Sequence, residues 1–96
     1  MANPNAQDVR VKPDERKFAV TVIYNGLERE VEVNSEQAVQ AVLAHAINAF
    51  GNLPQPHLLS LWTEGGAEIP DNSKVDDAGI RKGARLLLRP SAVKGG

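Results

Sequence analysis

The 96-residue chain contains no cysteine. Disulfide bridges, thiolate metal sites and a cysteine nucleophile are therefore excluded together. The chain has two histidines, His45 and His57, and without cysteine partners they give no basis for a metal site or a bound cofactor. A protein without disulfides is compatible with the cytosol, and we expect a cytoplasmic location.

An excess of one charge and a long apolar run are also lacking. The 11 basic and 12 acidic residues leave a net charge of −1, whereas phosphate binding needs a basic excess or stripe. No apolar run approaches the roughly 20 residues that cross a bilayer, and residues 1–7 do not read as a secretory signal. We therefore expect neither nucleic acid nor membrane as a partner. No nucleophile–base pair is visible, so we do not expect an enzyme.

The length of the chain allows one domain, flanked by two short polar ends. Residues 1–16 are rich in Asn, Pro, Asp and Arg and contain only two valines, Val9 and Val11. We expect a flexible tail there. Because the valines alternate with charged residues, a short extra strand is the lesser alternative. The domain is expected over residues 17–90. Residues 91–96 have nothing to pack against and are expected to form a second flexible tail.

Two alternating runs on either side of Asn25-Gly26 predict a β-hairpin. The runs cover residues 17–23 and 27–33, and both alternate with period two and are rich in valine. Asn-Gly tolerates the positive φ of a tight hairpin turn. The second run carries three glutamates on its other side, which we expect to face solvent. An acidic docking surface is the lesser alternative for these glutamates, which are Glu28, Glu30 and Glu32.

An amphipathic helix follows the predicted hairpin. Asn34 and Ser35 suit its N-cap, and Gly51 suits its C-cap. Between them, apolar residues recur at the spacing that places side chains on one helix face. They are Val39, Val42, Leu43, Ala46, Ile47 and Phe50. A helix with one apolar stripe covers one surface, and the inner face of the hairpin is the nearest.

Three further strands complete the pattern. Residues 58–63 read as a strand with Leu59 and Leu61 inward, residues 68–69 as a brief strand, and residues 84–89 as a last strand that Pro90 ends. The order strand, strand, helix, strand, short strand, strand predicts an α+β fold of the β-grasp type. Such a roll is a mixed sheet of four to five strands crossed by one helix.

From Lys17 to Gly96 the sequence resembles the ubiquitin family. Ubiquitin carries the same ordered run of an apolar strand, a Leu, a Leu-Ser-Asp-x-x-Ile turn, a Leu-x-Leu strand and a terminal Gly-Gly. The corresponding pieces here are Leu59-Ser60-Leu61, Ile69, Val75–Ile80, Leu86-Leu87-Leu88 and Gly95-Gly96. The asparagine- and alanine-rich, cysteine-free sequence is similar to the ubiquitin-like proteins of bacterial ubiquitination-like operons.

This resemblance implies a protein modifier that acts through its C-terminus. A partner enzyme adenylates the Gly96 carboxylate with ATP, a partner cysteine takes the acyl group, and a target amine receives it as an isopeptide bond. The implied partners are an activating enzyme, a conjugating enzyme, a processing or deconjugating peptidase and the target proteins. Gly95 and Gly96 are the implied activation site. The implied tail contacts to the enzymes are Ser91, Ala92, Val93 and Lys94.

A candidate partner surface and two other functions remain open. Ubiquitin's readers use an apolar patch on the sheet, and the matching positions here are the more polar Tyr24, Ser60 and Arg89. Trp62 is expected either to point outward as an anchor or to pack against the loop at residues 52–57. The first alternative function is a β-grasp sulfur carrier that forms a C-terminal thiocarboxylate. The second is a binding module with an idle tail.

Overall fold

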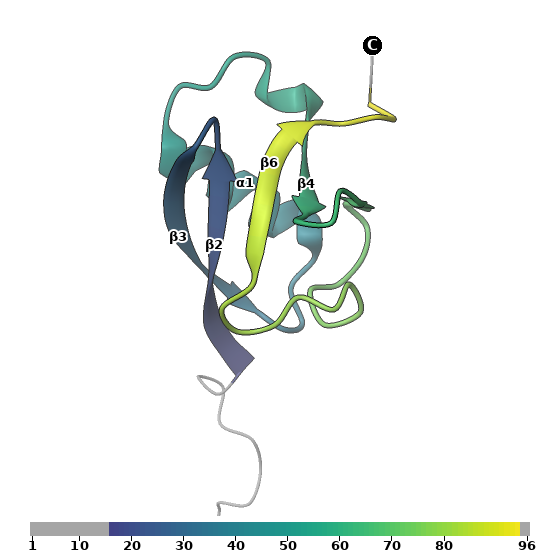
Figure 1. Cartoon of the computed structure of the whole chain (residues 1–96). Helices are drawn as coiled ribbons and strands as arrows, with labels where there is room; N and C mark the ends of the chain where they lie inside the picture. The colour runs from purple at the N-terminus through teal and green to yellow at the C-terminus, as the bar shows by residue number, and fades with distance from the viewer. Residues whose placement is uncertain (1–15, 95–96) are drawn as a thin grey trace, which may run out of the picture.

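The computed structural model describes residues 16–94 of the chain. Residues 1–15 of the predicted N-terminal tail lie outside this range, and with them the alternative of a short strand around Val9 and Val11. The predicted Gly95-Gly96 site also lies outside it. The elements, in chain order, are β2 (Lys17–Tyr24), β3 (Leu27–Asn34), α1 (Val39–Phe50), a 3-10 turn η2 (Pro56–Leu58), β4 (Leu59–Thr63), β5 (Glu68–Ile69) and β6 (Arg85–Pro90) (Figure 1).

The strands form one five-stranded sheet in the order β3-β2-β6-β4-β5. β6 runs parallel to β2 and antiparallel to β4, so the last strand of the chain lies in the middle of a mixed sheet. Figure 1 shows α1 crossing one face of this sheet. This arrangement is the β-grasp roll that the element order predicts, and the prediction of the fold class is confirmed.

The hairpin turns where the sequence predicts it. Asn25 and Gly26 have φ values of 50° and 81°, the positive region that this dipeptide tolerates. The turn pairs Tyr24 with Leu27 and thereby places Val20 opposite Val31 on the side of the core. The three glutamates of β3 are exposed, as expected from the alternation.

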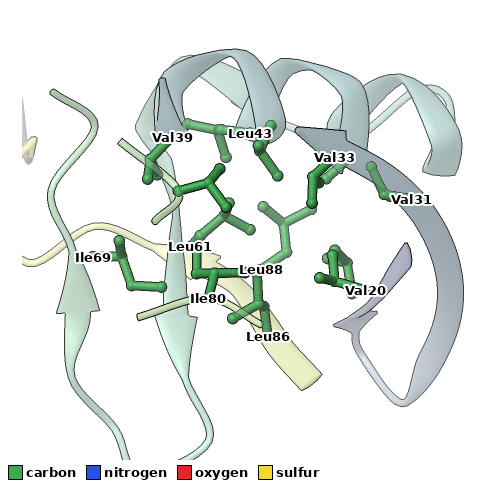
Figure 2. Packing of buried hydrophobic residues seen from close by; sticks show 14 of the residues in the cluster. Val20, Val31, Val33, Val39, Leu43, Leu61, Ile69, Ile80, Leu86 and Leu88 are labelled. Carbon is green, nitrogen blue, oxygen red and sulfur yellow. The ribbon is translucent and has the colours of Figure 1, made fainter. Parts of the chain in front are cut away.

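The hydrophobic core fills the space between α1 and the sheet (Figure 2). Leu61 and Leu88 pair across β4 and β6 and are among the largest fully buried side chains. The inward leucines predicted for β4 and β6 are therefore confirmed. The core members are Val20, Val22, Val31, Val33, Val39, Val42, Leu43, Ala46, Leu59, Leu61, Ile69, Val75, Ile80, Leu86 and Leu88.

The start of the helix differs from the prediction. Neither Asn34 nor Ser35 caps it, because α1 begins only at Val39, whose N–H donates to the Ser73 carbonyl at 2.7 Å. The Asn34 side chain accepts the N–H of Glu36 at 2.8 Å instead and stabilises the turn before the helix. A backbone carbonyl from a distant loop thus replaces the side-chain cap that the sequence favours.

Candidate functional site

β6 carries the chain to one end of the sheet and fixes where the last residues begin. Its inward leucines, Leu86 and Leu88, are buried in the core. One residue past the end of β6, the Ser91 N–H donates to the Leu58 carbonyl at 2.7 Å. The chain then leaves the sheet (Figure 1, yellow). We call residues 91–94 the tail segment, and its first residue is held by the same sheet that forms the domain.

The Ser91 hydroxyl bends the tail segment back toward β5. It donates to the carboxylate of Glu68 on β5 and accepts the N–H groups of Val93 and Lys94, both at 3.0 Å. The other oxygen of Glu68 accepts the N–H of Ala92 at 2.9 Å. Glu68 and Ser91 together give the backbone of the tail segment a turned conformation.

Lys94 closes the tail segment onto the body of the domain. Its Nζ lies 2.7 Å from an oxygen of Asp71 and donates to the Leu59 carbonyl at 2.7 Å. The two charged side chains are only 25% and 26% exposed, so solvent screens this pair less than a fully exposed one. We call these contacts the clasp. It joins Glu68, Asp71 and the Leu59 carbonyl on the body to Ser91, Ala92 and Lys94 on the tail segment.

The clasp corrects one expectation from the sequence. Residues 91–96 were expected to have nothing to pack against, and this is wrong for the tail segment, since Glu68 and Asp71 both bond to it. The flexibility of the tail stays a prediction. Gly95 and Gly96, the predicted activation site, lie outside the described residues.

A pocket of about 390 Å³ lies between the tail segment and the body. Ser60 lines it and is completely buried, so the predicted partner surface does not include Ser60 in this conformation. Its lining residues are Ser60, Glu68, Pro70, Asp71, Asn72, Val93 and Lys94. The tail segment thus forms one wall of a pocket whose other walls belong to the sheet and the loop after β5.

The other predicted surface residues come together only in part. Trp62 and Arg89 meet on the sheet face away from α1, where the Arg89 guanidinium lies 5.3 Å from the centre of the Trp62 ring. Trp62 therefore points outward, the first of the two placements expected for it, but it is half-buried under this cation. Its use as an anchor for a partner stays a prediction. Tyr24 packs against the core, with its ring centre 5.7 Å from that of Phe50. Tyr24 therefore does not share a surface with Trp62.

Two apolar residues outside the predicted partner surface complete the surface around Trp62. Leu87 pairs with Trp62 on one side and with Ile23 on the other, so the three side chains form a row across β2, β6 and β4. All three are half-buried. We call Ile23, Leu87 and Trp62 the apolar row. The alternation within each strand already indicated that Ile23 and Leu87 face away from the core.

We expect Arg89→Ala to shift the fluorescence emission of Trp62 to longer wavelength and to increase its quenching by acrylamide. The ring loses the guanidinium that covers it, and more of its surface meets water. Trp62 is the single tryptophan, so the signal needs no deconvolution. Arg29→Ala is the matched control, because Arg29 covers Phe50 in the same way at 5.3 Å. An unchanged emission in Arg89→Ala would show that the cation does not cover the ring in solution.

The clasp makes the tail segment sensitive to acid. The hydrogen bond from the Ser91 hydroxyl is the largest cause that lowers the pKa of Glu68 below its ordinary 4.5, and partial burial opposes it. Because the pKa of Glu68 is lowered, its charged carboxylate stabilises the clasp fully at pH values above the ordinary pKa. This contribution is lost as the pH falls through the pKa in the folded protein. Acid should therefore open the clasp.

We accordingly predict an inflection below pH 4.5 in the NMR shift of the Ala92 amide, which Glu68 accepts. Glu68→Gln should abolish the inflection. The amide of Val22 in the core serves as the reference for global unfolding. An Ala92 shift that titrates identically in wild type and Glu68→Gln would contradict the assignment.

Residues 16–94 offer neither a metal site nor a membrane-spanning helix. No three His, Cys, Asp or Glu side chains gather there into a group that could hold a metal ion. No helix in this part of the chain has the length and apolarity needed to cross a membrane. His45 and His57 are both exposed.

Two of the solved structures that resemble this chain are ubiquitin-like by description. A designed protein based on ubiquitin aligns with a TM-score of 0.70 at 16% identity, covering 84% of this chain and 96% of that one. The N-terminal ubiquitin-like domain of the 4931431F19Rik protein aligns with a TM-score of 0.68 at 14% identity, covering 100% and 97%. An Arabidopsis thaliana protein solved with sparse NMR data aligns with a TM-score of 0.66 at 20% identity, covering 81% and 90%. These likenesses show a ubiquitin-like β-grasp fold.

In sequence, none of the curated proteins matches the chain. A family model matches residues 13–96, which include every described strand and the helix, and continues through the tail segment to Gly96. The chain therefore belongs to this family, which is described as protein of unknown function (DUF2604).

Proposed function

We propose that this protein is a ubiquitin-like modifier, activated at the carboxylate of Gly96 and joined to target amines. The observation that carries the proposal is the position of the tail. β6 ends at Pro90 at one end of the sheet, and residues 91–94, the part of the tail that the structure describes, contribute no side chain to the core. When extended, residues 91–96 reach roughly 20 Å from the domain. Gly95 and Gly96, at the end of this extended tail, have no side chains, so they fit a narrow tunnel and leave the carbonyl open to attack.

The chemistry belongs to partner enzymes. The Gly96 carboxylate attacks the α-phosphate of ATP and releases pyrophosphate. A partner cysteine displaces AMP to form a thioester, and a target amine displaces the thiolate to form an amide. This chain supplies the acyl group and its access but no acid, base, nucleophile or cofactor. The partners are an activating enzyme, a conjugating enzyme and a peptidase that exposes or removes Gly96. We place them in the bacterial cytoplasm, as in the ubiquitination-like operons that the sequence resembles.

The apolar row supports the proposal by its position beside the tail. Leu87 lies at the centre of the row and on β6, the strand that leads into the tail segment. A partner that binds the row is therefore placed to receive the tail. Arg89 adds a positive charge between the row and Pro90. We include Trp62, Leu87, Ile23 and Arg89 in the surface that partner enzymes contact.

Two other functions are separable from this one. A sulfur carrier would use the same adenylation and then exchange one carboxylate oxygen for sulfur. A ubiquitin-like binding module would use only the apolar row, and the clasp is the observation in its favour, because it holds the tail segment against the body. These alternatives differ in what becomes of Gly96.

The experiment compares the N-terminally tagged chain with a version that lacks Gly95-Gly96, both expressed in the native host and purified under denaturing conditions. A modifier gives covalent species heavier than the chain, in wild type only. An intact mass shifted by one oxygen-to-sulfur exchange, without heavier species, would overturn the proposal in favour of a sulfur carrier. Non-covalent partners captured equally by both versions in a parallel native purification, without any covalent product, would leave a binding module.

A further inference from the structure

We propose that the clasp is a gate on Gly96. Glu68 and Asp71 are positioning residues that hold the tail segment in a closed form, and only the open form presents the C-terminus to a partner enzyme. The role in activation rests on the proposed function. The closed form is a property of this chain alone and can be measured without any partner.

The closed form is incompatible with an extended tail. The Ser91 hydroxyl accepts the N–H groups of both Val93 and Lys94, which requires the backbone to turn at once after Ser91. In an extended chain, successive residues advance by about 3.3 Å and these N–H groups move out of reach of the hydroxyl. A tunnel that accepts an extended tail therefore has to break these bonds first.

The residues that hold the tail segment closed lie on the body and carry like charges. Glu68 accepts from Ser91 and Ala92, and Asp71 pairs with Lys94. Glu68 and Asp71 can therefore be substituted while the tail residues that a partner enzyme would bind keep their sequence. Contacts of this partly exposed kind are modest, so removing one should shift the ratio of open to closed forms by about threefold to tenfold. The gate is therefore reversible.

The gate also specifies the chemistry of the partner. Opening separates the Lys94 ammonium from Asp71 and from the Leu59 carbonyl, its two partners in the closed form. A partner that provides an acidic group where Lys94 passes replaces the lost carboxylate, whereas a neutral or basic channel does not. We infer that the cognate activating enzyme has an acidic tail channel.

Trypsin is a suitable probe for this gate, because its specificity pocket is acidic and binds a lysine of an extended chain. Cleavage after Lys94 removes Gly95-Gly96 and is followed by intact mass. We expect Asp71→Asn and Glu68→Gln each to accelerate this cleavage about threefold to tenfold over wild type. Asp77→Asn is the matched control, since Asp77 is an exposed carboxylate on the turn before Ile80, and it should cleave at the wild-type rate.

Cleavage after Arg85, inside β6, reports global unfolding and has to stay at the wild-type rate for the comparison to hold. Equal cleavage after Lys94 in wild type, Asp71→Asn and Glu68→Gln would overturn the gate, whatever the host experiment shows. Accelerated cleavage establishes the closed form and the part that Glu68 and Asp71 play in it. If no covalent species then form in the host, the proposed function and the role in activation fail while the closed form stands.

Discussion

Replacing Leu61 by alanine should lower the free energy of unfolding by about 3 to 4 kcal/mol. Leu61 is fully buried and pairs with Leu88 on one side and Ile69 on the other (Figure 2). A side chain removed between two paired strands leaves a cavity that the sheet cannot close without breaking its ladder. A domain of this size has a total stability of about 5 to 10 kcal/mol, so this single change removes a large fraction of it.

Urea unfolding followed by circular dichroism measures the effect. Leu27→Ala is the matched control, because Leu27 is 55% exposed beside the hairpin turn, and it should change the stability by less than about 0.5 kcal/mol. A loss below about 1 kcal/mol for Leu61→Ala would mean that Leu61 is not at the centre of the core.

Deleting Gly95-Gly96 should have the opposite effect: it abolishes the function and leaves the stability unchanged. We expect all covalent species in the host to disappear while the free energy of unfolding changes by less than about 0.5 kcal/mol. The deletion removes the carboxylate that forms the acyl bond. It retains every core residue and every described contact of the clasp. Stability and function should therefore separate completely in this variant.

Asp77→Asn is the control for the deletion. Asp77 is an exposed carboxylate that takes no part in the clasp or the apolar row, and the substitution keeps both glycines. Covalent species should persist in Asp77→Asn at a level close to wild type. Their loss in this variant would show that the terminal carboxylate alone does not explain the function.

The fold could be predicted from the sequence because its signals are local. Asn25-Gly26 marks the hairpin within two residues, and alternation within β4 and β6 separates the inward leucines from their neighbours. The helix cap could not be predicted in this way. Val39 donates to the carbonyl of Ser73, a backbone group far along the chain that has no signature in residue type. Asn34 is a good cap by composition, but it is used in the preceding turn.

The candidate site was less predictable, because its contacts join distant parts of the chain. Glu68 meets Ser91 across 23 positions, and Lys94 meets the Leu59 carbonyl across 35. Periodicity indicates which face a residue takes, but it does not show which loop lies above it. Ser60 illustrates this limit: it is completely buried and lines a pocket with Val93 and Lys94, although alternation places it on the open face of the sheet.

Covalent attachment of Gly96 to other proteins is the property that decides the proposed function most directly. Target proteins captured through the N-terminally tagged chain are digested with trypsin, which cuts after Lys94 in the unfolded chain and leaves Gly-Gly on each modified lysine. We predict such lysines in proteins captured with wild type and none in those captured with the chain that lacks Gly96. Gly-Gly on the same lysines in both samples, or on none in wild type, would contradict the proposal that this chain is a protein modifier.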